Sequence, residues 1–397
     1  MNKKKLAGLL LACSFLVSGL GIIKSVNSGS TQIVVNAESA EISTKAKSAL
    51  LMEYSTGEII YEKECNKRLP IASMCKIMTL LLSFEAISAG RLNIDDMISV
   101  SENAAAMGGS QVFLEANAKY PVRELLKSIV VCSANDSCVA IAETISGSEE
   151  CFVEQMNLRA KALGCEDTLF ANCTGLPKEP QYSCAVDVGK MLRALLAHEE
   201  YFAFGKIWMD KFEHPEGRYT EISNTNRLVR FYDGCDGGKT GFTNQAGFCL
   251  AATAKRNNMR IISVVIGEEN SKQRFDDVRK TFDYAFANYT LKTAIDAATP
   301  IENQIGIVGG KKSSLPVFPE RCGYIFTKKG EEVNYSIETD VFDWVKAPAK
   351  AGTCVGQIKL YKDGVSIDTI SLILGEDCEK ASIFDEFKKI AGYWNFS

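Results

Sequence analysis

Three short groups of residues in this chain have the types and the order of a serine acyl-transfer site. In chain order they are Ser73-x-x-Lys76, Ser133-x-Asn135 and Lys239-Thr240-Gly241. Each group alone would be unremarkable, because such short patterns occur by chance on solvated surfaces. Together they form an S-x-x-K, S-x-N and K-T-G signature. The sequence therefore predicts a serine nucleophile that forms an acyl-enzyme intermediate.

The spacing of Ser73 and Lys76 suggests how a hydroxyl becomes a nucleophile. A serine hydroxyl is a weak nucleophile and needs an adjacent base. Residues i and i+3 of a helix face the same side, so Lys76 can reach the Ser73 hydroxyl. A lysine acts as a base only when it is neutral, which burial and a nearby positive charge both favour. Lys239 can supply that charge if the fold brings it close.

The other motif residues suit supporting roles in the same reaction. We expect Ser133 to relay a proton, and Asn135 to orient Lys76 and the substrate amide. Lys239 and Thr240 suit a terminal carboxylate, since they offer a cation and a hydroxyl group.

Backbone groups complete the expected site. The N–H groups of Ser73 and Phe242 are expected to form an oxyanion hole, with a helix dipole at Ser73 adding to it. Gly241 is expected to leave room for a substrate that lies along its strand. Cys75 and Cys132 flank catalytic residues; packing is the expected role, and redox or alkylation sensitivity is the alternative.

Composition limits the function classes. The chain has 397 residues, 46% hydrophobic and 24% charged, which indicates a globular protein long enough for two domains. Its formal net charge of −4 gives no indication of a nucleic-acid partner. The 14 cysteines include no Cys-x-x-Cys and there are only 2 histidines, so we expect no metal and no cofactor. Most cysteines are expected to be buried thiols, with a disulfide framework as the alternative.

The N-terminus has the pattern of a targeting segment. Lys3, Lys4 and Lys5 precede an apolar stretch over residues 6–23, and Val35-Asn36-Ala37 offers a cleavage site. We therefore expect a signal peptide over 1–37 and an exported protein at the cell wall or the outer face of the cytoplasmic membrane. Lipidation at Cys13 and an uncleaved membrane anchor are the alternatives.

Local patterns predict the elements that must position these motifs. A hairpin is expected around Ser55-Thr56-Gly57 and another around Asn257-Asn258. Helical periodicity follows Ser73 as far as Gly90 and is seen again in four later segments, 121–146, 150–165, 185–200 and 275–289. This order predicts an α+β, three-layer domain over 38–292, in which an antiparallel sheet carries the Lys-Thr-Gly strand.

The composition changes beyond residue 292. Short alternating segments predict a small C-terminal β-sandwich over 293–380, with a spacing or binding role. Residues 381–397 predict an amphipathic helix, because Ile383, Phe384 and Phe387 share one face with apolar residues further on. Either it makes peripheral contact with a membrane or it packs on the β-domain.

Longer stretches around the motifs resemble the low-molecular-mass penicillin-binding proteins, which are serine-type D-alanyl-D-alanine carboxypeptidases. The similarity covers about residues 40–292 and is carried by five stretches: 70–79, 108–114, 133–137, 224–228 and 236–243. The resemblance implies a penicillin-binding/β-lactamase-like fold. It also implies removal of the terminal D-alanine from peptidoglycan pentapeptide stems through an acyl-Ser73 intermediate, with β-lactams trapping the same serine.

Two departures and two alternatives accompany this resemblance. Where relatives often have Asn-Pro-His-Gly-Leu, this chain has Asn172-Cys173-Thr174-Gly175-Leu176, and Gln181 replaces a common histidine. Neither position belongs to the expected catalytic set. A class A-like β-lactamase is the nearest alternative, with Glu179 in a Glu-Pro-x-x-Ser stretch. The second is a catalytically weak peptidoglycan-binding protein.

Overall fold

A computed structural model describes residues 42–394 except residue 303, with side chains as far as Lys389. The predicted signal peptide over 1–37, including Val35-Asn36-Ala37 and Cys13, lies outside the described residues and stays a prediction. None of the helices in the described part combines the length and apolar character needed to cross a membrane.

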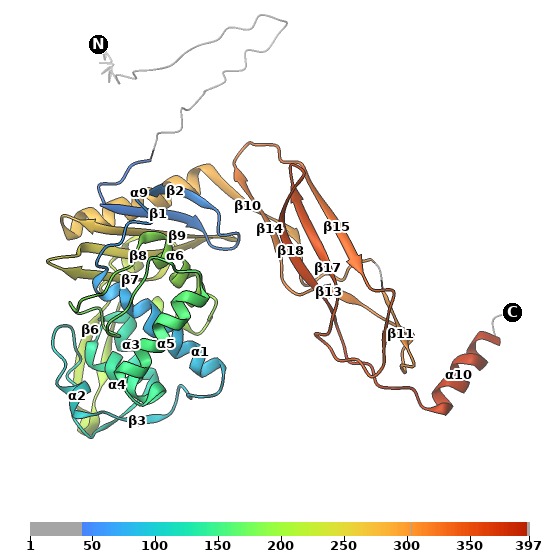
Figure 1. Cartoon of the computed structure of the whole chain (residues 1–397), viewed down its shortest axis with the longest axis horizontal. Helices are drawn as coiled ribbons and strands as arrows, with labels where there is room; N and C mark the ends of the chain where they lie inside the picture. The colour runs from blue at the N-terminus through green and yellow to red at the C-terminus, as the bar shows by residue number, and fades with distance from the viewer. Residues whose placement is uncertain (1–41, 303, 395–397) are drawn as a thin grey trace, which may run out of the picture. The chain divides into compact units, whose positions relative to one another are not determined.

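A five-stranded antiparallel sheet forms the centre of the first part of the chain (Figure 1). Its strand order is β2-β1-β9-β8-β7, so β7 lies at an edge. The strands are β1 (Ser48–Glu53), β2 (Ile59–Lys63), β7 (Cys235–Thr243), β8 (Gly247–Arg256) and β9 (Met259–Glu268). Both expected hairpins are confirmed, since β1 pairs with β2 and β8 pairs with β9.

The two faces of the sheet contact different helices, which makes three layers. Every residue of β9 is buried, and its side chains alternate between two apolar clusters. Ile261 and Val265 pack towards α9 (Ser271–Asn288), whereas Ile262 and Val264 pack towards α6 (Ala185–Leu195) and the helices beyond it. A strand buried on both faces is mostly apolar, as β9 is apart from Arg260, Ser263 and Glu268.

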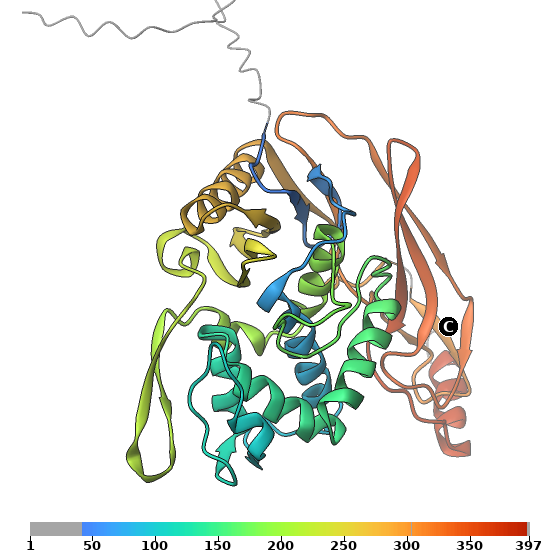
Figure 2. The same cartoon turned by 60° about the vertical axis from the view of Figure 1, so that its left-hand side comes forward.

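The helical layer carries two of the three motifs. It contains η1 (Ala72–Cys75), α1 (Lys76–Ser88), α2 (Glu102–Ala105), α3 (Val122–Val131), α4 (Asn135–Ser146), α5 (Glu149–Ala162), α6 and α7 (Tyr201–Gly205). The short helix α8 (Leu228–Phe231) instead adds Leu228 to the apolar cluster on the α9 face. Two antiparallel strand pairs join the helical layer. One is β3 (Met97–Ser99) with β4 (Lys119–Pro121), and the other is the hairpin of β5 (Met209–Glu213) and β6 (Tyr219–Ser223) around η2 (Pro215–Gly217). The β5–β6 hairpin, which was not predicted, extends outward in yellow-green in Figure 2.

The C-terminal part is rich in β-structure around its own apolar core. Its sheets are β13-β18-β17-β15, β12-β11-β16 and β10-β14. The strands are β10 (Tyr289–Ile295), β11 (Ile305–Val308), β12 (Ser314–Leu315), β13 (Val317–Pro319), β14 (Gly323–Lys328), β15 (Tyr335–Val341), β16 (Trp344–Lys346), β17 (Cys354–Lys362) and β18 (Val365–Leu374), followed by α10 (Ile383–Trp394). The predicted α+β fold with a C-terminal β-rich part is confirmed.

The cysteines also follow the sequence-based expectation. Within the described residues all of them are free thiols, and most are buried. Such thiols pack as small apolar side chains.

Candidate active site

Ser73 and Lys76 meet at the start of α1. Ser73 lies in the 3₁₀ turn η1, and Lys76 is the first residue of α1. Lys76 Nζ lies 3.1 Å from Ser73 Oγ, and the lysine side chain has no exposed surface. The expected i, i+3 contact is therefore present.

The Lys76 amino group has three oxygen acceptors. Besides Ser73 Oγ, it donates to Asn135 Oδ1 at 2.7 Å and to the Thr174 carbonyl at 2.6 Å. An ammonium group carries three N–H donors, so these oxygens match its charged form. The three oxygens fix the position of the Lys76 amino group beside Ser73.

Asn135 and Ser133 border the turn between α3 and α4. Asn135 Nδ2 donates to the Gly108 carbonyl at 2.7 Å, so its Oδ1 faces Lys76. Ser133 has a positive φ of 67° and is 4% exposed. Its hydroxyl has no hydrogen-bond partner among the described residues. The structure thus leaves the Ser133 hydroxyl buried and without a bond to any other described residue.

The edge strand β7 brings a second lysine into the same site. Lys239 is 2% exposed and its Nζ donates to the Thr240 carbonyl at 3.3 Å. Burial, together with the positive charge of Lys76, lowers the pKa of Lys239 to about 7. Near neutral pH Lys239 therefore exchanges between its charged and neutral forms.

Gly241 lies against the turn that carries Ser73. A Cβ atom at this position would lie 2.5 Å from the Ile71 carbonyl oxygen. Any larger residue would push β7 away from η1. The structure thus gives a different reason for glycine here than room for substrate: the two backbones themselves are in contact.

The free edge of β7 presents backbone donors to the site. The Gly238 N–H points away from β8 and donates to the Tyr201 hydroxyl at 2.8 Å. N–H groups alternate in direction along a strand, so those of Thr240 and Phe242 point to the same free edge. This free edge faces η1, the turn that carries Ser73.

The turn at 172–176 is the part of the site that sequence reasoning missed. Asn172 Oδ1 accepts from the Thr174 N–H at 3.2 Å and from the Gly175 N–H at 2.7 Å, which aims the Thr174 carbonyl at Lys76. Gln181 holds the turn from outside by accepting the N–H groups of Ala171 and Asn172. An asparagine that bonds to the backbone two residues ahead is a recognisable turn pattern and could have indicated this role.

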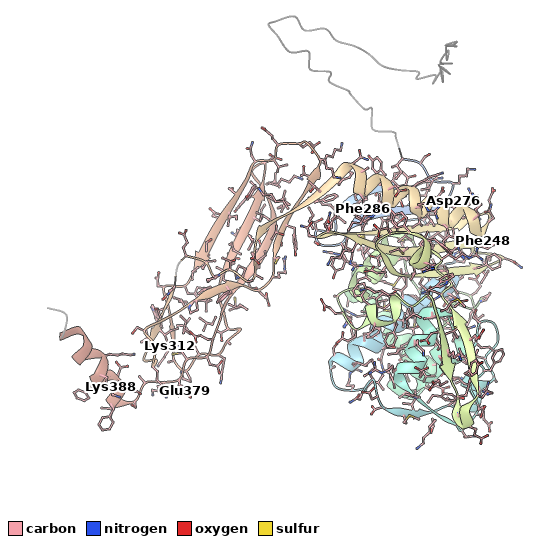
Figure 3. The ribbon with its side chains drawn as sticks, turned by 180° about the vertical axis from the view of Figure 1, so that it is seen from behind. Phe248, Asp276, Phe286, Lys312, Glu379 and Lys388 are labelled. Carbon is pink, nitrogen blue, oxygen red and sulfur yellow. The ribbon has the colours of Figure 1, made fainter. Side chains whose placement is uncertain are left out.

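Arg274 on α9 is a second residue that was not predicted. Its Nη1 donates to the Gly241 carbonyl at 3.3 Å and to the Cys249 carbonyl at 3.4 Å. The guanidinium also faces the ring of Phe248, labelled at this end of the sheet in Figure 3, at 5.5 Å. Burial lowers the pKa of Arg274 to about 10, so it is charged at neutral pH. It adds positive charge beside the strand that carries Lys239.

The two cysteines beside the motifs are bonded to carbonyl groups. The Cys75 thiol donates to the Asn172 carbonyl at 3.2 Å, and the Cys132 thiol donates to the Ser128 carbonyl at 3.2 Å. Burial raises the pKa of Cys132 to about 11 and that of Cys75 still further. Both are therefore thiols, and poor nucleophiles, at neutral pH.

Glu179, which the β-lactamase alternative requires, is placed elsewhere. It is exposed, and its carboxylate accepts a bond from Gln245 Nε2 at 3.4 Å. No contact among the described residues joins it to Ser73 or Lys76.

Comparison with known families matches most of the chain. Residues 34–270 match a family described as D-alanyl-D-alanine carboxypeptidase. Residues 289–380 match one described as penicillin-binding protein 5, C-terminal domain.

Individual relatives match over nearly their whole length. The chain is 40% identical over 356 residues to the D-alanyl-D-alanine carboxypeptidase DacF of Bacillus subtilis, covering 89% of this chain and 91% of the relative. It is 31% identical to DacC of Escherichia coli, covering 86% of each chain.

Solved structures agree with these matches. The crystal structure of penicillin-binding protein 5 from Haemophilus influenzae has a TM-score of 0.67 at 29% identity, covering 86% of this chain and 99% of its own. The carboxypeptidase DacD from Francisella tularensis has a TM-score of 0.66 at 29% identity, covering 89% and 98%.

Proposed function

This chain belongs to the D-alanyl-D-alanine carboxypeptidase family, and from that premise we propose the role of each residue in its site. The protein is a serine-type DD-carboxypeptidase of cell-wall metabolism that removes the terminal D-alanine from peptidoglycan stem peptides. One observation supports the residue roles above all others: Lys76 Nζ contacts Ser73 Oγ and the Asn135 amide oxygen at once.

Acylation begins at Ser73. Its Oγ attacks the carbonyl carbon of the penultimate D-alanine, and its proton passes to the neutral form of Lys76. The oxyanion accepts hydrogen bonds from the N–H groups of Ser73 and Phe242. The C–N bond then breaks, and Ser133 relays the proton to the amine of the departing D-alanine.

The second lysine makes the neutral form of Lys76 accessible. In the empty site both amino groups compete for charge in a buried environment. The carboxylate of the terminal D-alanine binds beside Lys239 and the Thr240 hydroxyl and favours the charged form of Lys239. The remaining proton of the pair then resides on Lys239, which leaves Lys76 as the base.

Deacylation returns the enzyme to its starting state. A water molecule attacks the acyl carbon and gives a proton to Lys76, and the bond to Ser73 Oγ breaks. The serine recovers its proton, and the shortened peptide leaves as a carboxylic acid.

The direct test is release of D-alanine from a synthetic peptide ending in D-Ala-D-Ala. The wild type, starting at Glu38, is compared with Ser73→Ala. We expect release by the wild type and none by the variant. Release that persists in Ser73→Ala would contradict the assignment of the nucleophile. A folded wild type that acylates with penicillin without releasing D-alanine would point to another acyl acceptor or to a binding role.

We further propose that β-lactams acylate Ser73 and that the acyl-enzyme persists for minutes or longer. The exposed position of Glu179 supports slow deacylation, since no acidic residue with a contact to Ser73 or Lys76 is found in the described part of the chain. Rapid hydrolysis of nitrocefin that is abolished in Glu179→Gln would contradict this proposal.

We also propose that the protein acts outside the cytoplasmic membrane and that α10 contacts the membrane surface. Ser382 and Asp385 cap the helix reciprocally, with the Asp385 N–H on Ser382 Oγ and the Ser382 N–H on Asp385 Oδ2. The helix exposes 76% of Ile383, 81% of Phe384 and 67% of Phe387. Large apolar side chains this exposed suit a lipid interface.

A further inference from the structure

A buried carboxylate next to Asn135 holds a loop of the site by its backbone. Asp136 has no exposed surface. Its Oδ2 accepts from the Val112 N–H and the Leu114 N–H, each at 3.1 Å. Its Oδ1 accepts from the Ser137 N–H at 2.9 Å. The backbone N–H groups bind the carboxylate, and the carboxylate in turn keeps these backbone segments in position.

The loop held by Asp136 is the one that fixes Asn135. Upstream of Val112, the Ser110 carbonyl accepts a hydrogen bond from the Asn135 N–H at 2.7 Å. The Gly108 carbonyl accepts one from Asn135 Nδ2, also at 2.7 Å. Gly109 passes so close that a Cβ there would lie 2.8 Å from Asn135 Nδ2. The loop therefore decides which end of the Asn135 amide faces Lys76.

The orientation of that amide matters for Lys76. With Nδ2 on the Gly108 carbonyl, Oδ1 faces Lys76 Nζ at 2.7 Å. Without the carbonyl the amide can rotate, and an NH₂ group would then face an ammonium group, donor against donor. Lys76 would lose an acceptor that positions it beside Ser73.

The loop needs such an anchor because its backbone is strained. Phe113, between the two residues bound to Asp136, has a φ of 64° and an exposed side chain. A bulky residue rarely adopts this left-handed region, because its Cβ then crowds the following carbonyl oxygen. Its carbonyl also accepts from Arg218 Nη2 at 3.0 Å, which ties the loop to the β5–β6 hairpin. Asp136 inside and Arg218 outside thus hold the same strained turn.

We propose that Asp136 is a positioning residue of the carboxypeptidase reaction. By binding the N–H groups of Val112 and Leu114, it holds the 108–114 loop so that Asn135 presents its oxygen to Lys76. This inference rests on the proposed roles of Asn135 and Lys76.

The test is a double-mutant cycle on acylation by a penicillin, with binding and acylation rate constants resolved by rapid mixing. The proteins are wild type, Asp136→Asn, Asn135→Ala and the double variant. We expect Asp136→Asn to slow the acylation rate constant at least tenfold, with a smaller change in penicillin affinity. In the Asn135→Ala background the same change should alter acylation less than twofold, because its target is gone.

Two further variants separate positioning from folding. Asp187 is also a buried carboxylate that accepts backbone and side-chain bonds, from the Asp167 N–H and the Thr168 hydroxyl, and Asp187→Asn should lose stability without slowing acylation. Arg218→Ala removes the hydrogen bond to the Phe113 carbonyl by changing an accessible side chain. It should slow acylation about threefold when Asn135 is present and leave it unchanged in the Asn135→Ala background. If Asp136→Asn does not fold, Arg218→Ala decides the question.

The outcomes distinguish the two levels of the proposal. Wild-type acylation by folded Asp136→Asn, or equal losses with and without Asn135, would overturn the positioning role. Where only Arg218→Ala can be measured, unchanged acylation would overturn it. Full acylation by Asn135→Ala would instead overturn the proposed role of Asn135 in catalysis.

Discussion

At the scale of single residues, the site depends on the number of protons shared by two lysines. Lys76 is surrounded by three oxygen atoms, and Lys239 is buried close enough for the two charges to repel. Interacting groups titrate as a pair, so the proton count of the pair is the relevant quantity. In the proposed mechanism the pair carries one proton, which leaves Lys76 neutral and Lys239 charged.

This arrangement predicts the pH dependence of D-alanine release. Since the pKa of Lys239 is about 7, the site loses one proton as the pH rises through that value, and the proposed mechanism requires this loss. We expect kcat/KM to rise about tenfold per pH unit below pH 7 and to level off above it. The measurement is kcat/KM on a D-Ala-D-Ala peptide from pH 5.5 to 9.

A variant identifies the group that titrates. Lys239→Gln removes the second charge, and the residual kcat/KM should no longer show the rise near pH 7. A profile that is flat from pH 6 to 8 in the wild type would contradict the shared-proton mechanism. An unchanged midpoint in Lys239→Gln would assign the rise to another group.

At the scale of elements, three segments far apart in sequence meet at Lys76. Helix α1 supplies the lysine, the start of α4 supplies Asn135, and the 172–176 turn supplies a carbonyl. The 172–176 turn can pack against η1 because residue 175 is a glycine. Its φ is 81°, and a Cβ there would lie 2.1 Å from the Ala72 carbonyl oxygen. Thr174, where the chain departs from the usual family sequence, therefore contacts the site through its carbonyl.

The turn leads to a prediction that separates side chain from backbone. Thr174 contributes its carbonyl to Lys76, so Thr174→Ala should acylate within about threefold of the wild type. Asn172→Ala leaves the buried donors of Thr174 and Gly175 without an acceptor, at about 1–3 kcal/mol for each group. We expect it to acylate with penicillin at least tenfold more slowly. Equal rates for the two variants would contradict the role given to the turn.

At the scale of the whole molecule, the sheet and the helical layer form the site at their boundary. The edge strand β7 is free to face η1, because β8 pairs with only one of its sides. The C-terminal part contains its own core and ends in α10, on which Lys388 is labelled in Figure 3. The Lys389 ammonium donates to the carbonyl of Gly310, which follows β11, while Ile383, Phe384 and Phe387 of α10 stay exposed.

The exposed face of α10 leads to a prediction about membrane association. A double change, Phe384→Ser with Phe387→Ser, removes two side chains that are each worth about 1.5–3 kcal/mol when buried. Partition onto anionic phospholipid vesicles should fall at least tenfold, with D-alanine release unaltered.

A matched control is Phe342→Ser, which removes a phenylalanine that is 59% exposed and lies outside α10. It should sediment with the vesicles as the wild type does. Equal sedimentation of the double variant and the wild type, or of the wild type and a chain ending at Lys380, would contradict membrane contact through this helix.

Local signals in the sequence were sufficient for the reaction class and for most elements. The i, i+3 spacing of Ser73 and Lys76 needs only helical geometry, and the hairpin at Asn257-Asn258 needs only turn chemistry. Alternating apolar residues indicated the strands of the C-terminal part. These features depend on neighbours within a few residues, and that is why they could be read without the fold.

The contacts between distant segments were decided by tertiary structure alone. The sequence does not show that the Thr174 carbonyl reaches Lys76, that Arg274 bonds to the Gly241 carbonyl, or that Asp136 holds the loop beside Asn135. Each contact joins groups that are brought together only when the sheet and the helical layer pack. The pKa of Lys239 depends on the same packing, because burial and the distance to Lys76 exist only in the folded chain.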